Sequence, residues 1–227
     1  MGGSLFFKTL DTKKENHELQ QKYTKLQTDL ENENKAINTS LHKLNENVSI
    51  IDASIKPDEK RWVRIKQVRK AIQDTIKYTN NSLTIKELTD ISTAAVDSSE
   101  ENDVPVSLML AVITVESNFH IKAISHAGAR GLMQIIPDTA ETISLETGKR
   151  NYDLFKIKDN IQFGSYYLWK MIKLFGEQDL AIRAYNCGPT FTKKVRSGEY
   201  PEYPKETINY LIKVNEWKLK YDNLGVR

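Results

Sequence analysis

Glu116 stands at the end of a nearly unbroken apolar run that begins at Val106. A helix with apolar residues on every side is buried all round, so this carboxyl is expected in the last turn of a core helix. Burial, unsatisfied carbonyls and the negative end of the helix dipole all disfavour a charge there. The pattern predicts a carboxyl with a raised pKa that can serve as a general acid near neutral pH. A surface glutamate just beyond a core helix is the alternative.

Four short motifs follow one another along the chain. They are Glu116–Phe119 (ESNF), Gly128–Gln134 (GARGLMQ), Ala184–Asn186 (AYN) with Gly188-Pro189, and Glu206–Tyr210 (ETINY). In order and spacing they resemble the four motifs of family 1 lytic transglycosylases, whose catalytic domain is goose-lysozyme-like. The resemblance extends from Leu83 to Tyr221 and leaves the first third of the chain unexplained.

The number of carboxylates bears on the reaction. A hydrolytic glycosidase normally uses two, and within the motifs only Glu116 is a candidate. Glu206 is expected in the first turn of a helix, where a negative charge is favoured for structural reasons. The resemblance implies that Glu116 alone suffices. It protonates the oxygen between N-acetylmuramic acid and N-acetylglucosamine in peptidoglycan, then removes a proton from the muramoyl C6 hydroxyl. That hydroxyl attacks C1 and leaves a 1,6-anhydro end.

Three further residues beside the acid have supporting roles that the resemblance implies. Ser117 hydrogen-bonds to Glu116 or to the sugar, with an ordinary serine at a helix end as the alternative. Met133 supplies an apolar wall that raises the pKa of Glu116. Gln134, expected across from Glu116, binds sugar hydroxyl or acetamido groups.

The last two motifs contribute Tyr185, Asn186 and Tyr210. The resemblance implies that Tyr185 and Asn186 contact the acetamido group and the oxocarbenium-like ring, and that Tyr210 reaches Glu116 from the other side. Either tyrosine could instead be buried packing with a satisfied hydroxyl.

Two other functions remain open for the same motifs. A hydrolytic muramidase would use water in place of the internal hydroxyl. A wall-binding structural component of a secretion machine or phage virion would keep the fold without the activity.

No metal or cofactor is expected. The histidines lack metal-ligand spacing, and they are His17, His42, His120 and His126. Cys187 is the only cysteine, which excludes an internal disulfide.

The elements that must position these residues are predicted to be helices, so the fold class is all-α with at most a small β-hairpin. Asp103 and Pro105 suit the entry of the Glu116 helix, and residues 132–136 should form an irregular or hairpin-like wall. A helix capped by Asp138 and Glu141 and closed by Gly148 should follow. Further helices are expected over 159–175, closed by Gly176, and over 177–186 and 204–221. Another helix, expected before the Glu116 helix, carries Ile85, Leu88, Ile91 and Ala95 on one side.

The N-terminal segment has a different periodicity. Its apolar residues follow the 3-4 alternation of a coiled-coil seam, with one slip near Glu33: Leu19, Tyr23, Leu26, Leu30, Ile37, Leu41, Leu44, Val48, Ile51 and Ile55. Such a helix should pair with another chain, giving a homo-oligomer through residues 19–55, or fold back on the next helix. A lone solvated helix is the alternative.

A basic amphipathic helix should follow Pro57, which ends the rod. Residues 57–82 hold seven basic and three acidic residues. The face over 60–77 could lie on anionic phospholipid or an anionic wall polymer, or be only solvated. Nucleic acid is a poor partner, because there is one short basic patch without aromatic interleaving. The expected domains are 1–56, 57–82 and 83–227, with a linker over residues 80–82 at the end of the second.

Composition is ordinary for a soluble, largely helical protein, with 39% hydrophobic and 28% charged residues among 227. No apolar run is long enough to cross a bilayer. One hypothesis is that Met1–Ser4 are a cloning remnant and that an export signal or anchor was removed. The expected location is the cell envelope, with a virion or a secretion system as the alternative.

Overall fold

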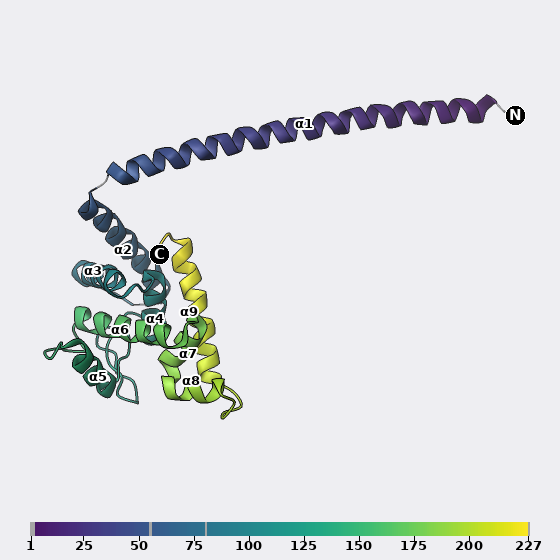
Figure 1. Ribbon diagram of the computed structural model, residues 1–227. Coiled ribbons are helices and arrows are strands. Elements are labelled where there is room, and N and C mark those ends of the chain that lie inside the picture. The colour runs from purple at the N-terminus through teal and green to yellow at the C-terminus, as the bar shows by residue number, and fades with distance from the viewer. Residues whose placement is uncertain (1–2, 55, 80, 227) are drawn as a thin grey trace. The chain divides into compact units, whose positions relative to one another are not determined.

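The computed structural model describes residues 3–54, 56–79 and 81–226, and the side chains of 17–50, 56–78 and 81–226. The chain forms two compact units, Met1–Pro57 and Asp58–Arg227. Every regular element within these ranges is a helix (Figure 1), and the only β pairing there consists of isolated bridges. The prediction of an all-α fold is confirmed.

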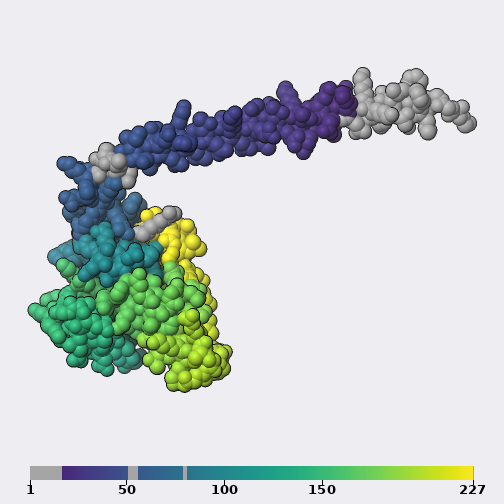
Figure 2. Space-filling model, in the orientation of Figure 1, coloured from purple at the N-terminus to yellow at the C-terminus, as the bar shows by residue number. Residues whose placement is uncertain are grey.

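The first unit consists of α1 (Gly3–Ser54). Its described part is one helix thick along its length (Figure 2). The predicted seam from Leu19 to Val48 is open, with each apolar side chain between 51% and 69% exposed. Ile55 and the side chain of Ile51 lie outside the described residues. The helix thus carries an apolar stripe that its own unit leaves uncovered.

The second unit begins with α2 (Pro57–Thr79) and α3 (Ile85–Asn102). The inner face of α2 enters the core through Ile65, Val68 and Ile72, while its Arg61 and Arg64 form ion pairs with acidic residues of α3. The basic helix therefore belongs to this compact unit, and part of its charge is used inside the fold. Asn80, in the expected linker, lies outside the described residues.

A capping box formed by Thr84 and Glu87 starts α3, a signal that the sequence analysis missed. Three of the four residues expected on its inner side, Leu88, Ile91 and Ala95, are buried, whereas Ile85 is 76% exposed. The exposed residue stands in the first turn, outside the packed part of the helix.

The centre of the unit is α4 (Val106–Ser117), which packs against α9 (Lys205–Asn223) and α3. Every residue from Val106 to Thr114 is buried, as predicted for a helix that is apolar all round. The predicted start of α4 was wrong in detail. Asp103 is in the left-handed conformation that ends α3, and Pro105 is the N-cap of α4 rather than its first helical residue.

Four more helices lie between α4 and α9 in the described chain. They are α5 (Pro137–Thr147), α6 (Ile157–Phe175), α7 (Gln178–Cys187) and α8 (Pro189–Arg196). Gly148 and Gly176 end α5 and α6 as predicted. The prediction of a capping box at Asp138 was wrong, because α5 starts at Pro137 without a side-chain cap. The helix α8 was not predicted from the sequence.

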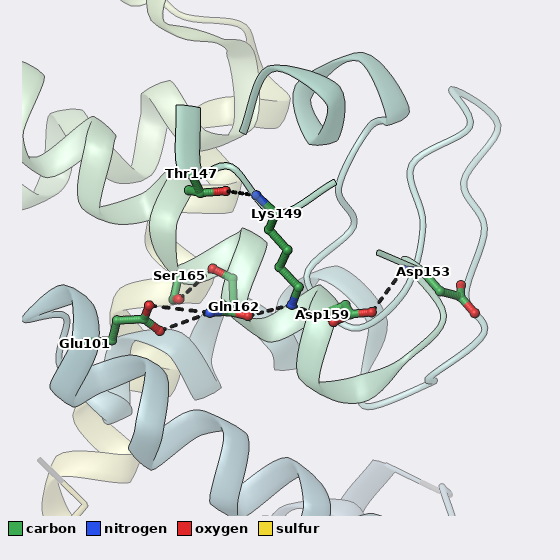
Figure 3. Close-up of polar contacts among 7 residues, drawn as sticks. All are labelled: Glu101, Thr147, Lys149, Asp153, Asp159, Gln162 and Ser165. Carbon is green, nitrogen blue, oxygen red and sulfur yellow. Dashed lines mark hydrogen bonds and ion pairs between the residues drawn. The ribbon is translucent and has the colours of Figure 1, made fainter. Parts of the chain in front are cut away.

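A polar network holds the loop after α5 (Figure 3). The Lys149 ammonium contacts Asp159 and Gln162 of α6, each at 2.6 Å, and Gln162 in turn donates to Glu101 of α3. The first turns of α6 therefore tie this loop to the helical core. No helix in the described ranges combines the length and the apolarity that crossing a membrane would take.

Candidate active site

Glu116 lies in the last turn of α4 and is partly buried. Directly after it the backbone reverses, with Asn118 and Phe119 both at positive φ. The pKa of Glu116 is raised to about 7, chiefly by burial; the hydrogen bond from Tyr210 lowers it, and the charge of Glu206 raises it. The carboxyl can therefore hold or release a proton near neutral pH.

Tyr210 reaches this carboxyl from α9. Its hydroxyl donates to Oε1 of Glu116 at 2.7 Å, and its ring is buried. Burial and then the charge of Glu116 raise the pKa of Tyr210 well above its ordinary value, so the hydroxyl stays protonated and remains a donor. The expected contact between these two residues is present.

The loop around Met133 forms one wall beside the acid. The Ser117 hydroxyl lies 2.7 Å from the carbonyl oxygen of Leu132, and the Tyr185 hydroxyl donates to the carbonyl of Met133 at 2.9 Å. Met133 itself is fully buried. Ser117 and Tyr185 therefore hold the loop through its backbone, and neither hydroxyl bonds to Glu116.

Asn160 of α6 fixes the same loop from behind, a role that the sequence analysis missed. Its Oδ1 accepts from the amide of Met133 at 2.7 Å, while Nδ2 donates to the carbonyls of Arg130 and Leu154. The side chain is buried and fully hydrogen-bonded. A polar residue on the apolar face of the predicted 159–175 helix was the available signal.

A pocket of about 270 Å³ opens beside Tyr185. Its polar lining includes Gln134 and Asn186, and its apolar lining includes Ile135, Ile136 and Tyr167. The Gln134 amide nitrogen donates to the carbonyls of Ala123 and Gly131, so this side chain is held within its loop. Tyr185 lines this pocket, and its pKa is raised well above the ordinary value by burial and then by the charge of Glu116.

The structure thus places the candidate residues in three groups. Glu116 and Tyr210 are directly bonded, and Gln134, Tyr185 and Asn186 line one pocket. Ser117 and Met133 belong to the supporting wall. The described side chains contain no group of three or more histidines, cysteines and acids that could hold a metal ion.

A family model for the transglycosylase SLT domain matches residues 94–208, which is half of the chain. The chain belongs to the transglycosylase SLT domain family. The matched region includes Glu116, the Met133 loop and the Asn186 pocket, and it ends two residues before Tyr210.

Curated relatives of this SLT domain are named as murein transglycosylases. The chain is 27% identical over 163 residues to membrane-bound lytic murein transglycosylase C of Glaesserella parasuis, covering 56% of this chain and 44% of that protein. It is 35% identical over 92 residues to the soluble lytic murein transglycosylase of Salmonella typhimurium, covering 38% of this chain and 14% of that protein. The match thus spans less than half the length of either relative.

Solved structures of lytic transglycosylases are also similar to this chain. The lytic transglycosylase Slt of Pseudomonas aeruginosa, solved as an inactive glutamate-to-glutamine mutant, matches with a TM-score of 0.52 and 27% identity, covering 57% of this chain and 23% of that one. The 70 kDa soluble lytic transglycosylase of Escherichia coli matches with a TM-score of 0.53 and 22% identity, covering 60% of this chain and 28% of that one. The second likeness supports the fold alone.

Proposed function

We propose that this chain is a peptidoglycan lytic transglycosylase in which Glu116 acts first as acid and then as base. The observation that carries the proposal is the partly buried Glu116 carboxyl, with a pKa of about 7 and a hydrogen bond from Tyr210, inside an SLT domain. A carboxyl that changes protonation near neutral pH can serve both steps.

In the first step, protonated Glu116 donates its proton to the glycosidic oxygen between N-acetylmuramic acid and N-acetylglucosamine. The C1–O bond breaks, and the N-acetylglucosamine part leaves with that proton as a hydroxyl. Positive charge develops on the muramoyl ring, and the new Glu116 carboxylate faces it. Tyr210 stabilises this carboxylate, because its hydrogen bond favours the ionised form.

In the second step, the Glu116 carboxylate removes the proton of the muramoyl C6 hydroxyl as that oxygen bonds to C1. The product is a 1,6-anhydro end, water is not consumed, and Glu116 regains its proton. A second catalytic carboxylate is not required. Glu206 is exposed in the first turn of α9, and its charge helps to keep Glu116 protonated before the reaction.

In the pocket, Asn186 and Gln134 are proposed to bind the sugar substituents, chiefly the acetamido group. Tyr185 is proposed to border the reacting ring, and the fully buried Met133 to add to the apolar surroundings of Glu116. Ser117 is proposed to hold the Met133 loop in place. These roles agree with the bonds that hold the Met133 loop.

Mass spectrometry of digested peptidoglycan tests the proposal. The parent chain should release muropeptides with 1,6-anhydro ends, each lighter by one water than the hydrolytic product. Reducing ends alone would establish a hydrolytic muramidase. A Glu116→Gln variant as active as the parent would refute the catalytic assignment, and a parent that releases no muropeptides would favour a wall-binding structural component.

The proposed location is the cell envelope, since the relatives include both a membrane-bound and a soluble murein transglycosylase. A virion or secretion-system setting would use the same activity locally. For the first unit we propose homo-oligomerisation through residues 19–55, supported by the open apolar stripe. For α2 we propose contact with an anionic membrane surface or wall polymer over 60–77. The support is the exposed Lys66 and Lys70 on its outer face.

A further inference from the structure

Thr207 makes an unusual contact between two of the sequence motifs. It lies in the first turn of α9, between Glu206 and Tyr210, and its side chain is 1% exposed. Its hydroxyl donates to Oδ1 of Asn186, on α7, at 2.8 Å. This bond ties the fourth motif to the third.

We propose that Thr207 is a positioning residue that fixes which end of the Asn186 amide faces the pocket. With Oδ1 accepting from Thr207, the Asn186 Nδ2 group is left as a donor, and it makes no hydrogen bond within the described residues. The buried hydroxyl would lose its acceptor if the amide turned over, which opposes the flip. Asn186 therefore presents N–H, rather than C=O, to a bound ligand.

Gln134 presents the opposite polarity in the same pocket. Its Nε2 group is taken up by the carbonyls of Ala123 and Gly131, so Oε1 is the atom left to accept a hydrogen bond. One fixed donor and one fixed acceptor match a secondary amide, which has one C=O and one N–H. Ile135 and Ile136 add apolar surface suited to a methyl group.

This inference rests on the proposed function, since it takes the ligand to be an N-acetylated sugar. It adds that discrimination for the acetamido group depends on Thr207, a residue that itself touches no ligand. A hydroxyl in place of the acetamido group cannot use both fixed partners. Loss of the Thr207 hydroxyl should therefore weaken binding of N-acetylated sugars selectively.

The test is calorimetric binding of two neutral tetrasaccharides, the β-1,4-linked tetramers of N-acetylglucosamine and of glucose. All proteins carry Glu116→Gln so that the ligand is not cleaved. Adding Thr207→Val, which keeps the side-chain shape, should weaken binding of the N-acetylated tetramer by about three- to tenfold, the range for one neutral hydrogen bond. Binding of the glucose tetramer should change less than about twofold.

Thr207→Ser is the matched control. It retains the hydroxyl and should keep the preference for the N-acetylated tetramer. Equal weakening of both tetramers by Thr207→Val, no weakening of either, or no binding of the N-acetylated tetramer would overturn the inference. In one further outcome, Thr207→Val weakens only the binding of the N-acetylated tetramer while the protein with Glu116 intact releases no anhydro product. That result would support the inference and refute the proposed reaction.

Discussion

The Tyr210 hydroxyl donates to Oε1 of Glu116 at 2.7 Å, joining the first turns of α9 to the last turn of α4. The contact sets the protonation of the acid. Burial alone favours the neutral carboxyl, whereas this bond favours the carboxylate that the second step needs. The pKa of about 7 is the balance of burial, this hydrogen bond and the charge of Glu206.

Tyr210→Phe should move the alkaline limit of activity to higher pH. The bond from Tyr210 lowers the pKa of Glu116, so its removal raises that pKa, and the acid form persists further into the alkaline range. The measurement is kcat/KM for peptidoglycan digestion as a function of pH. An alkaline limb that stays in place or moves to lower pH would contradict this role of Tyr210.

Tyr185→Phe is the matched comparison, because the Tyr185 hydroxyl bonds to the carbonyl of Met133 and not to the acid. The alkaline limb of the kcat/KM profile of Tyr185→Phe should coincide with that of the parent. Stability should fall by about 1 kcal/mol for the lost hydrogen bond, and urea unfolding measures this.

Glu116→Gln should stabilise the fold at alkaline pH. The folded pKa of about 7 exceeds the ordinary 4.5, so stability from this group is fully present below pH 4.5 and is lost as pH rises through 7. Above pH 8 the parent should be less stable than the variant by about 3 kcal/mol, and near pH 5 the difference should be small. Urea unfolding at both values measures it, and a difference independent of pH would be the contrary result.

The sequence predicted the parts of this structure that depend on local pattern. The apolar run ending at Glu116 gave both the buried helix and the direction of the pKa shift, and Gly148 and Gly176 marked two helix ends. Asp103 was misassigned because an aspartate, usually a helix-starting residue, can also end a helix in the left-handed conformation, as it does in α3.

Long-range contacts could not be predicted in the same way. The position of Asn160 on an apolar helix face indicates burial but not its partner, and Thr207 resembles an ordinary polar helix residue. Their partners, the Met133 loop and Asn186, are known only from the packing of α6 and α9. Ser117 adjoins the acid in sequence, yet the direction of the helix turns its hydroxyl toward Leu132.

Gly131→Ala should destabilise the Met133 loop more than Gly128→Ala does. Both glycines have positive φ, but a β-carbon at Gly131 would overlap the Asn160 side chain and the carbonyl of Leu154, whereas Gly128 faces open space. Backbone strain alone should cost about 1 kcal/mol at Gly128, and Gly131→Ala should cost at least about 1–2 kcal/mol more. Denaturant unfolding of the two variants checks this, and equal losses would show that the Asn160 contact is not tight.

Replacing two seam leucines should dissociate the proposed oligomer. Leu26→Ser with Leu44→Ser removes two exposed apolar side chains from the stripe on α1, and should weaken association at least about a hundredfold. Sedimentation of the full chain measures it. Lys25→Ser with Lys43→Ser, which changes neighbouring positions outside the seam, should leave the mass unchanged. A parent chain that sediments as a monomer would remove the oligomer proposal.

The pKa of the Glu116 carboxyl tests the central claim most directly. Infrared difference titration of the parent against Glu116→Gln isolates this one carboxyl band across the pH range. We expect the midpoint of this carboxyl titration near pH 7. A midpoint near the ordinary glutamate value of 4.5 would mean that the group is already ionised at neutral pH and cannot be the proton donor.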